Sequence, residues 1–325
     1  MFSYRHAFHA GNHADVLKHT VLIATLAHLL EKEAALTVVD THAGAGLYRL
    51  DGDYAGTSGE AADGILRLLA PKTTQKPAAM SDAPDLPAQG RARKAAKPAG
   101  TIDAPLAPAI QGYLDLVRAF NPNGGSRVYP GSPFIVHHML RDHDKLKLFE
   151  LHPTDARTLD ANIAQLEAGR QIAVLREDGF GSATKFMPPP SRRALMLCDP
   201  SYEMKTDYGR VLDLIGESLK RFATGTYAVW YPIIPRPEAH DLPRRLKTMA
   251  TKAGKSWLHA TLTVKSSKVL TTPTGDQKRP GLPASGMFLI NPPYTLKGQL
   301  QPALEQLKTL LAQDRNAGFT LDSGG

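Results

Sequence analysis

The sequence contains little cysteine and no long apolar run. Cys198 is the only cysteine among 325 residues and lies in an apolar segment, which excludes an internal disulfide framework and predicts a buried, unreactive thiol. No apolar stretch approaches the ~18 residues needed to span a bilayer, and residues 1–6 lack the apolar core of a secretory signal. We therefore expect a cytoplasmic protein without a membrane partner.

Two common nucleotide-binding patterns are also missing. The turn Ala43-Gly-Ala-Gly-Leu-Tyr48 does not supply the G-x-G-x-x-G of nicotinamide enzymes, and no G-K-[ST] follows it as a phosphate-binding loop would require. This argues against a nicotinamide oxidoreductase. No cysteine or paired carboxylate completes a recognisable metal site around the histidines near the start, so we expect no metal.

Positive charge exceeds negative charge. Lysine and arginine number 39 against 31 acidic residues, a net charge of +8, which favours a polyanionic partner. A merely basic enzyme remains the alternative. The hydrophobic share of 42% is ordinary for a globular protein, and 325 residues can bury one large core, so we expect a single domain over 1–325.

One segment departs from this composition. Residues 71–109 are rich in proline, alanine and lysine and carry few large apolar side chains, which predicts a flexible segment. It is either a basic tether for RNA or a solvated loop. Helical patterns over 57–69 and 112–120 flank it. Together these features predict a helical insertion subdomain over 49–126.

Outside the insertion, short apolar runs alternate with amphipathic segments. Strands are expected at 36–39, 145–150, 172–175, 194–198, 226–231, 258–264 and 286–290, and helices from Asn12, at 155–167, 208–222, 243–253 and 300–312. Ser132 suits a helix N-cap, and Pro243 suits the first turn of its helix. The alternation predicts an α/β fold of the doubly wound, Rossmann-like kind, parallel except near its end.

Three expected strands end on acids. Asp40 precedes the small-residue turn Ala43-Gly-Ala-Gly46, Glu150 ends the next strand, and Asp178 precedes Gly179. Because parallel strands end at one edge of the sheet, such carboxylates can accept hydrogen bonds from a ribose and from an adenine amino group. A tight turn without a ligand is the alternative for residues 43–46.

Asp199-Pro-Ser-Tyr202 follows the strand at 194–198. A strand-end [D/N]-P-P-[Y/F/W] is typical of amino-group methyltransferases that use S-adenosylmethionine. The acid and the carbonyl of Pro200 can accept both hydrogens of an exocyclic amine, and the ring of Tyr202 can stack on the base. Ser201 replaces the second proline and makes the turn less rigid.

Asn291-Pro-Pro-Tyr294 matches that signature better by letter. Its position argues against it, because it ends the last expected strand and nothing downstream supplies cofactor residues. We therefore favour Asp199 as the catalytic acceptor.

The sequence resembles the RlmJ family of 23S rRNA adenine-N6 methyltransferases. The resemblance spans nearly the whole chain outside 71–109, and the family usually has D-P-P-Y where this chain has Asp199-Pro-Ser-Tyr202. It is carried by Ser3-Tyr-Arg-His-Ala-Phe-His-Ala-Gly-Asn-His-Ala-Asp-Val-Leu-Lys-His19, Asp40-Thr-His-Ala-Gly-Ala-Gly46, Tyr129-Pro-Gly-Ser-Pro133, Glu150-Leu-His-Pro153, Tyr202-Glu-Met-Lys-Thr-Asp-Tyr208 and Arg221-Phe-Ala-Thr-Gly225.

This resemblance implies a Rossmann-like class I methyltransferase fold with a small helical insertion. It also implies methylation of N6 of an adenine in 23S rRNA, at position 2030 by the family's name. The enzyme would act as a monomer on RNA that is free or in an early assembly intermediate. An enzyme acting on DNA or another RNA, and a non-catalytic RNA-binding relative, remain alternatives.

The resemblance further implies the residue roles. S-adenosylmethionine contacts fall on Lys18, His19, His42, Ser132, Glu150, Asp178 and Gly179, with Glu150 at the ribose and Asp178 at the adenine amino group. Asp199, Pro200 and Tyr202 form the catalytic turn, and Tyr4 contacts the substrate adenosine. Taken singly, Tyr4 could instead be a packing residue, His19 a core histidine and Asp178 a turn former.

Overall fold

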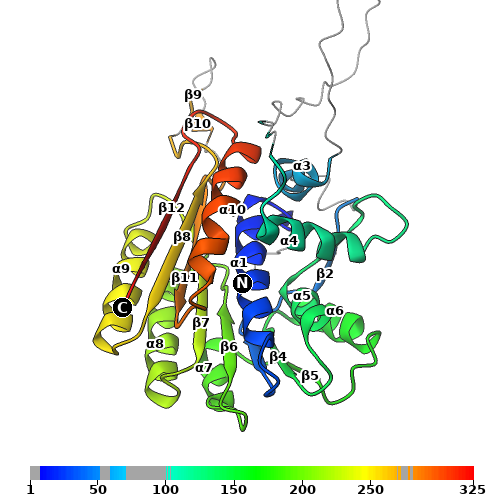
Figure 1. Ribbon diagram of the computed structural model, residues 1–325, viewed down its shortest axis with the longest axis vertical. Coiled ribbons are helices and arrows are strands. Elements are labelled where there is room, and N and C mark those ends of the chain that lie inside the picture. Colours follow the sequence, from blue (N-terminus) through cyan, green and yellow to red (C-terminus); the bar gives the residue numbers. More distant parts are fainter. Residues whose placement is uncertain are drawn as a thin grey trace, which may run out of the picture.

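The computed structural model describes residues 8–51, 59–70, 100, 102, 104–268, 270–271, 277–278 and 281–325. Its centre is an eight-stranded sheet in the order β12-β8-β11-β7-β6-β1-β4-β5 (Figure 1). The strands are β1 Thr37–Asp40, β4 Lys145–Phe149, β5 Ile172–Leu175, β6 Ala194–Cys198, β7 Thr226–Ile233, β8 Trp257–Thr263, β11 Ala284–Ile290 and β12 Gly318–Gly324.

Strands β5, β4, β1, β6 and β7 run parallel to their neighbours. β11 lies between β7 and β8 and is antiparallel to both, and β12 is antiparallel to β8. The expectation of a doubly wound α/β sheet that is parallel except near its end is thus confirmed. The edge strand β12, which follows the closing helix, was not expected from the sequence.

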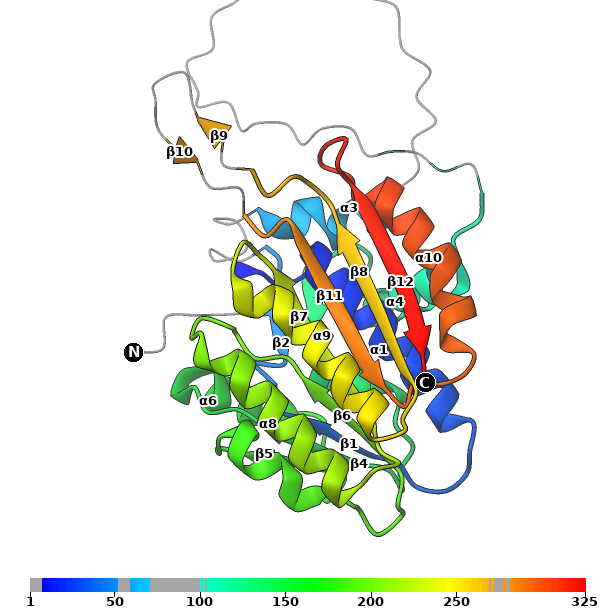
Figure 2. The same ribbon diagram turned by 90° about the vertical axis from the view of Figure 1, so that its left-hand side faces the viewer.

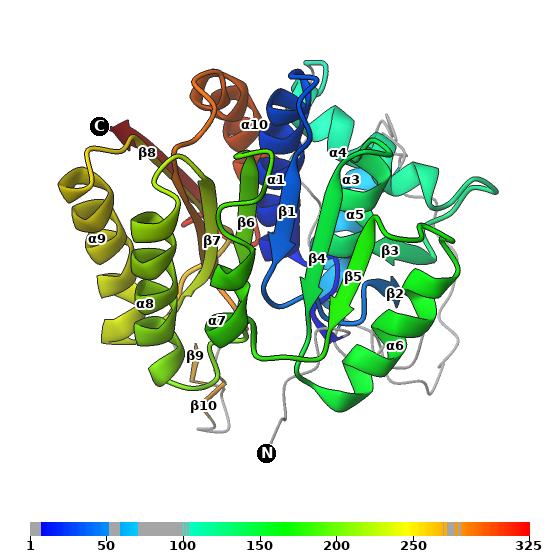
Figure 3. The same ribbon diagram turned by 90° about the horizontal axis from the view of Figure 1, so that it is seen from below.

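Helices cover both faces of the sheet (Figures 2 and 3). One core cluster joins α1, α4, α5, α6 and α10 to one face, and a second joins α8 and α9 to the other. The helices are α1 His13–Leu30, α3 Ile65–Leu69, α4 Pro108–Ala119, α5 Ser132–Met139, α6 Pro153–Ala164, α7 Gly179–Ser182, α8 Thr206–Arg221, α9 Pro237–Lys252 and α10 Leu296–Leu310, with 3-10 turns η2 Glu60–Asp63 and η3 Ala183–Phe186.

Helix α1 is enclosed over most of its length. Asn12 caps it as expected, because its Oδ1 accepts hydrogen bonds from the N–H groups of Ala14 at 2.9 Å and Asp15 at 3.0 Å. Every residue from His13 to Leu26 is buried, including Asp15 and Lys18. Buried charges need partners, so the environment of α1 is constrained by its polar residues as well as by its apolar ones.

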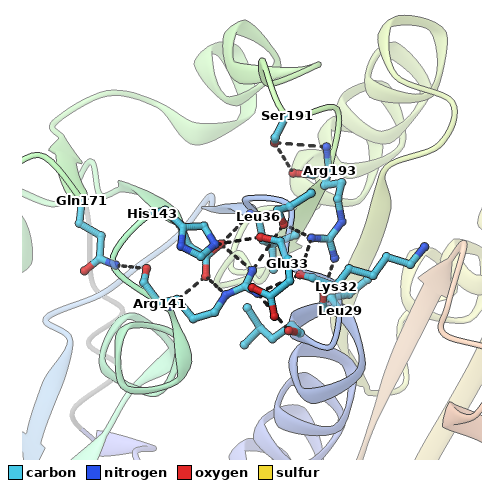
Figure 4. A network of polar contacts seen from close by, with 12 residues as sticks. Leu29, Lys32, Glu33, Leu36, Arg141, His143, Gln171, Ser191 and Arg193 are labelled. Carbon is cyan, nitrogen blue, oxygen red and sulfur yellow. Dashed lines mark hydrogen bonds and ion pairs between the residues drawn. The ribbon is translucent and has the colours of Figure 1, made fainter.

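A polar network ties the end of α1 to the start of β1 (Figure 4). Asp144 is fully buried and accepts hydrogen bonds from Leu36 N at 2.7 Å and from the Arg141 guanidinium at 2.9 Å. Arg141 also donates to Lys32 O at 2.8 Å, and Arg193 donates to Leu29 O and Ala34 O. The loop between α1 and β1 is therefore held at the amino ends of the parallel strands, while Lys18 in the first half of α1 reaches Asp199 after β6.

Two local expectations were wrong. Pro243 lies inside α9, which begins at Pro237 and continues past the proline to Lys252, so the proline does not start the helix. Ser132 is the first residue of α5, with Gly131 as N-cap, and its hydroxyl donates to Asp40. A hydrogen bond to another element cannot be foreseen from the capping pattern alone.

The helical pattern at 57–69 consists of η2 and α3 where it is described; residues 52–58 lie outside the described part. Segment 71–109 also lies mostly outside it, and α4 already begins at Pro108. The pairing of β2 Leu47–Arg49 with β3 Val128–Pro130 was not expected. This pairing brings together the two ends of the segment 49–126. Within the described residues, no helix has the length and apolar character to cross a membrane.

Candidate active site

A cavity of about 410 Å³ opens at the carboxyl ends of the parallel strands. Eight of the residues expected from the sequence line it: Lys18, His42, Ser132, Glu150, Asp178, Gly179, Asp199 and Pro200. His19 and Tyr202 are not among the lining residues, and Tyr4 lies outside the described part of the chain. Residues from α1, from the turn after β1 and from the ends of β4, β5 and β6 therefore meet at one place.

Two glycines let the backbone approach this cavity closely. Gly44 has φ +60°, and a Cβ built there would lie 2.3 Å from the Tyr48 hydroxyl. A Cβ on Gly179 would lie 2.0 Å from Thr41 O. Larger residues at these positions would displace the turn after β1, so the small residues serve the shape of the cavity.

Glu150 holds the turn and also faces the cavity. Its Oε2 accepts from Gly44 N at 2.8 Å, and its Oε1 accepts from His152 N at 2.7 Å. Burial raises the pKa of Glu150, while these two N–H groups act in the opposite direction. Each carboxylate oxygen can accept a second hydrogen bond, so Glu150 can still bind a hydroxyl group in the cavity.

Asp40 is fully buried beneath the turn. It accepts a hydrogen bond from the Ser132 hydroxyl at 2.6 Å and a longer one from His42 N at 3.3 Å. Burial raises the pKa of Asp40 to about 6 despite these bonds. Asp40 thus connects β1 to α5 and is not itself a cavity residue.

Asp178 belongs to a cluster that the sequence revealed only in part. It caps α7 by accepting from Phe180 N at 3.1 Å and pairs with Arg210 of α8. The Arg210 guanidinium lies 4.2 Å from the Phe180 ring centroid, and the His42 ring meets the same ring edge-on at 4.6 Å. Burial lowers the pKa of His42 to about 4, so this imidazole is neutral at pH 7.

Phe180 and Arg210 both line the cavity but were not expected as site residues. Phe180 follows the strand-end acid by two positions, which is a weak signal. Arg210 lies on α8, 32 residues after Asp178, and no sequence pattern places it here.

Lys18 connects α1 to the turn Asp199-Pro-Ser-Tyr202. Its ammonium lies 2.9 Å from Asp15 Oδ1 and donates a short hydrogen bond to Asp199 Oδ2. Only 4% of Lys18 is exposed. Burial alone would lower the pKa of Lys18, but the two carboxylates outweigh it and raise the pKa above its usual value. The lysine is therefore charged, and it occupies one oxygen of Asp199.

Tyr202 and His19 are buried and do not line the cavity. Tyr202 is 3% exposed; its hydroxyl donates to Trp230 O at 2.7 Å, and its ring lies 4.7 Å from that of Tyr208. His19 Nδ1 lies 2.7 Å from the Tyr129 hydroxyl. In this conformation the Tyr202 ring anchors the turn that carries Asp199 and is not presented to a base.

Asn291 lies at the opposite edge of the sheet. It follows β11, which is antiparallel, so it is next to the start of β7 and not its end. Its Nδ2 donates to Ala223 O at 3.0 Å and Gly225 O at 2.7 Å. Asn291 is thus not among the residues that line the cavity, whereas Asp199 is, and the last strand is β12 and not β11.

Fold and site together define a class. The sheet has five parallel strands, β5 to β7, and the antiparallel strand β11 is inserted between β7 and β8. This sheet, with the D-P-x-Y turn after β6, is that of a Rossmann-like class I S-adenosylmethionine-dependent methyltransferase. More narrowly, the chain belongs to the family described as ribosomal RNA large subunit methyltransferase D, RlmJ. The family model matches residues 33–85 and 100–322.

Individual relatives agree with this membership. The chain is 39% identical over 311 residues to ribosomal RNA large subunit methyltransferase J of Escherichia coli K12, covering 96% of this chain and 94% of that one. It is 36% identical over 323 residues to the Haemophilus influenzae protein of the same name, covering 99% and 98%. The crystal structure of protein LPL1258 from Legionella pneumophila superimposes with a TM-score of 0.75 at 27% identity, covering 98% of this chain and 99% of that chain.

Proposed function

We propose that this protein transfers a methyl group from S-adenosylmethionine to the N6 amine of an adenine in 23S rRNA. The observation that carries the proposal is that Asp199 and Pro200 line the same cavity as the acids that end β4 and β5. A methyl acceptor held at Asp199 would therefore lie beside a cofactor held by Glu150 and Asp178.

The residues of the cavity fit this cofactor. Glu150 has acceptor capacity for the ribose hydroxyls, and Asp178 for the adenine amino group, while Gly44 and Gly179 leave room where a Cβ would not fit. We assign further contacts to Lys18, His42 and Ser132, which also line the cavity. When bound, S-adenosylmethionine supplies an electrophilic methyl group on a sulfonium. His19 would act through the packing of α1.

Asp199 and Pro200 would orient the acceptor. The carboxylate and the carbonyl of the following residue can each accept one hydrogen of an adenine amine, which fixes the nitrogen in place. As positive charge develops on this nitrogen, the same two acceptors stabilise it. Tyr202 supports the turn through its hydrogen bond to Trp230 O. A non-catalytic RNA-binding role is disfavoured, because Ser201 leaves Asp199 and Pro200 at the cavity.

The target base must be unpaired or turned out of its helix, since a stacked amine could not reach Asp199. We therefore propose that the substrate is 23S rRNA that is free or in an early assembly intermediate. We also propose that the enzyme acts as a monomer in the cytoplasm. Tyr4 remains the predicted contact to the substrate adenosine, and 49–126 remains the predicted insertion subdomain.

The proposal is tested with labelled S-adenosylmethionine and three polynucleotides: unmodified 23S rRNA transcript, the same transcript with adenine 2030 replaced by guanine, and DNA of matching sequence. We expect N6-methyladenosine in the first transcript alone. Methylation that persists in the substituted transcript would move the target adenine, and methylation confined to DNA would overturn the assignment to rRNA.

A further inference from the structure

Trp230 lies in the middle of β7, beside the proposed catalytic turn. Cys198 of β6 pairs in parallel with Val229 of β7, so the next residues along the two strands are Asp199 and Trp230. Side chains at paired positions of parallel strands point to the same face of the sheet. Trp230 therefore extends from the sheet on the same side as Asp199, the side that α1 covers.

A cation already lies between these two side chains. The Lys18 ammonium donates to Asp199 Oδ2, and the same nitrogen is 5.9 Å from the centroid of the Trp230 ring. That distance is within the roughly 6 Å over which a cation interacts with an aromatic face. A tetrahedral, positively charged nitrogen is thus held at once by the catalytic carboxylate and by an indole ring.

Tyr202 packs beside Trp230. The backbone carbonyl of Trp230 accepts a hydrogen bond from the Tyr202 hydroxyl at 2.7 Å, and the centroids of the two rings are 6.0 Å apart with an interplanar angle of 54°. The ring is half-buried, and its Nε1–H has no hydrogen-bond acceptor among the described residues. Replacing the indole with another ring therefore removes no hydrogen bond to a described residue, which makes this position suited to tests of ring electronics.

We propose that the Lys18 ammonium marks the place of the reacting N6 nitrogen, and that the Trp230 ring stabilises the positive charge that develops there during methyl transfer. This inference rests on the proposed adenine-N6 methylation. It assigns to Trp230 the aromatic role that Tyr202, buried behind the turn, does not take in the structure.

The charge balance explains why an aromatic face helps. The methyl carbon forms a bond to N6 while its bond to the donor sulfur breaks, and the electron pair of that bond stays on sulfur. N6 becomes positively charged and is neutralised when one of its hydrogens leaves as a proton to solvent. The ring interacts with this charge only as the reaction proceeds, so it should act on the rate of transfer more than on RNA binding.

Lys18 must leave Asp199 when the amine arrives. Its contact with Asp15 at 2.9 Å provides a partner for the displaced ammonium. The lysine would then keep a buried counter-charge while Asp199 becomes free to accept the amine.

The decisive experiment lowers the electron density of the Trp230 ring in steps by fluorination. The chain has two tryptophans, so the Trp257→Phe variant leaves Trp230 alone, and Trp257 itself stacks on Phe288 of the neighbouring β11. This variant is prepared with tryptophan and with mono-, di- and trifluorotryptophan. We expect the logarithm of the single-turnover rate constant to fall linearly with the cation affinity of the ring, by roughly 10-fold in total, with little change in RNA affinity.

A flat series in an active enzyme would overturn the role of Trp230 and leave the proposed function standing. Absence of adenine methylation in the unsubstituted protein would instead defeat the proposed function. If Trp257→Phe lowers the thermal midpoint too far, Trp230→Phe and Trp230→Leu replace the series. There we expect rate losses of about 3-fold and about 10-fold, and equal losses would contradict the proposal.

A second measurement does not depend on turnover. The ¹⁹F resonance of 5-fluorotryptophan at position 230 is compared before and after Lys18→Met, with Lys220→Met on the exposed side of α8 as control. We expect a shift in the first variant and none in the second. An unmoved resonance in a folded Lys18→Met protein would show that the ammonium does not lie over the ring.

Discussion

Charge at the centre of the site is shared among Asp15, Lys18 and Asp199. The lysine is held by carboxylates from two different elements, and it is nearly inaccessible to water. Removing one partner leaves the ammonium with the other. Effects of substitution at Asp199 should therefore appear mainly in chemistry and not in folding.

Asp199→Asn keeps the size of the side chain but removes its negative charge. We expect methyl transfer to fall by about 100-fold or more, because a developing cation loses a charged acceptor, while the affinity for S-adenosylmethionine stays near normal. Rates of labelled methyl transfer and calorimetric titration with S-adenosylmethionine measure the two quantities. Asn291→Ala, at the opposite sheet edge, is the control, and loss of transfer only in that variant would contradict the assignment of Asp199.

Glu150→Gln addresses the cofactor. The change removes the charge that would bind the ribose hydroxyls and disturbs the acceptor for Gly44 N. We expect S-adenosylmethionine to bind about 10-fold or more weakly, since a hydrogen bond to a charged group is the stronger kind. Glu177→Gln is the matched control, because Glu177 is exposed and pairs with Lys185 outside the cavity. Equal affinities in the two variants would remove Glu150 from the ribose.

The raised pKa of Asp40 leads us to expect that the stability of the folded protein depends on pH. Because the folded pKa of about 6 exceeds the usual value of 3.8 for an aspartate, the folded state holds the proton more tightly. Its contribution to stability is complete below the unfolded pKa and is lost as pH rises from about 4 through 6. Relative to Asp40→Asn, the wild type should gain about 2 kcal/mol between pH 7 and pH 4. Urea unfolding across this range measures the difference, and a constant difference would contradict it.

At the scale of elements, α1 carries Lys18 to the strand ends. Its start is determined by Asn12, whose Oδ1 satisfies two N–H groups and whose Nδ2 donates to Glu60 at 2.9 Å. The helix is buried along most of its length, so a change in its first turn is transmitted to the site through a rigid element.

Asn12→Ala should lower the free energy of unfolding by about 1 kcal/mol, the usual cost of losing an N-cap. Asn12→Ser retains an oxygen acceptor for the cap and should recover most of this loss. Chemical denaturation of the two variants beside the wild type provides the comparison. If serine is no better than alanine, the contribution of Asn12 lies in its bond to Glu60 and not in capping.

The antiparallel strand β11 separates the two candidate catalytic turns. Asp199 follows a strand that runs with the parallel set, whereas Asn291 follows one that runs against it. The two turns consequently lie at opposite edges of the sheet. The Asn291 side chain binds two carbonyl groups there, which gives it a structural role.

At the scale of the molecule, a net charge of +8 implies attraction to a polyanion. We expect the KM for RNA to rise with salt in a log–log linear manner, with a slope of roughly 0.7 for each phosphate contacted, because counterions are released on binding. The affinity for S-adenosylmethionine should change far less over the same range. Initial rates between 50 and 200 mM KCl, in the range where such effects are large, test this, and a salt-independent KM would argue against electrostatic RNA binding.

Residues that follow strands were the most predictable part of the site. Glu150, Asp178 and Asp199 were expected together because parallel strands end at one sheet edge, and the structure brings all three to the cavity. Phe180 and Arg210, which also line the cavity, were not expected, and neither was the position of Trp230, which is not a lining residue but lies beside the Lys18 ammonium. Their positions depend on the packing of α8 and on the register of β7, neither of which has a local sequence signal.

The sequence by itself determined the α/β class, the strand-end acids and the family, because periodicity and contiguous motifs are properties of the chain. Only the tertiary structure decided which side chains reach the cavity. Tyr202 and His19 were expected at the site from the sequence. They do not line the cavity, and they form hydrogen bonds to Trp230 O and to the Tyr129 hydroxyl, respectively. Side-chain direction at a turn or on a buried helix follows from partners distant in sequence, and packing alone supplies those partners.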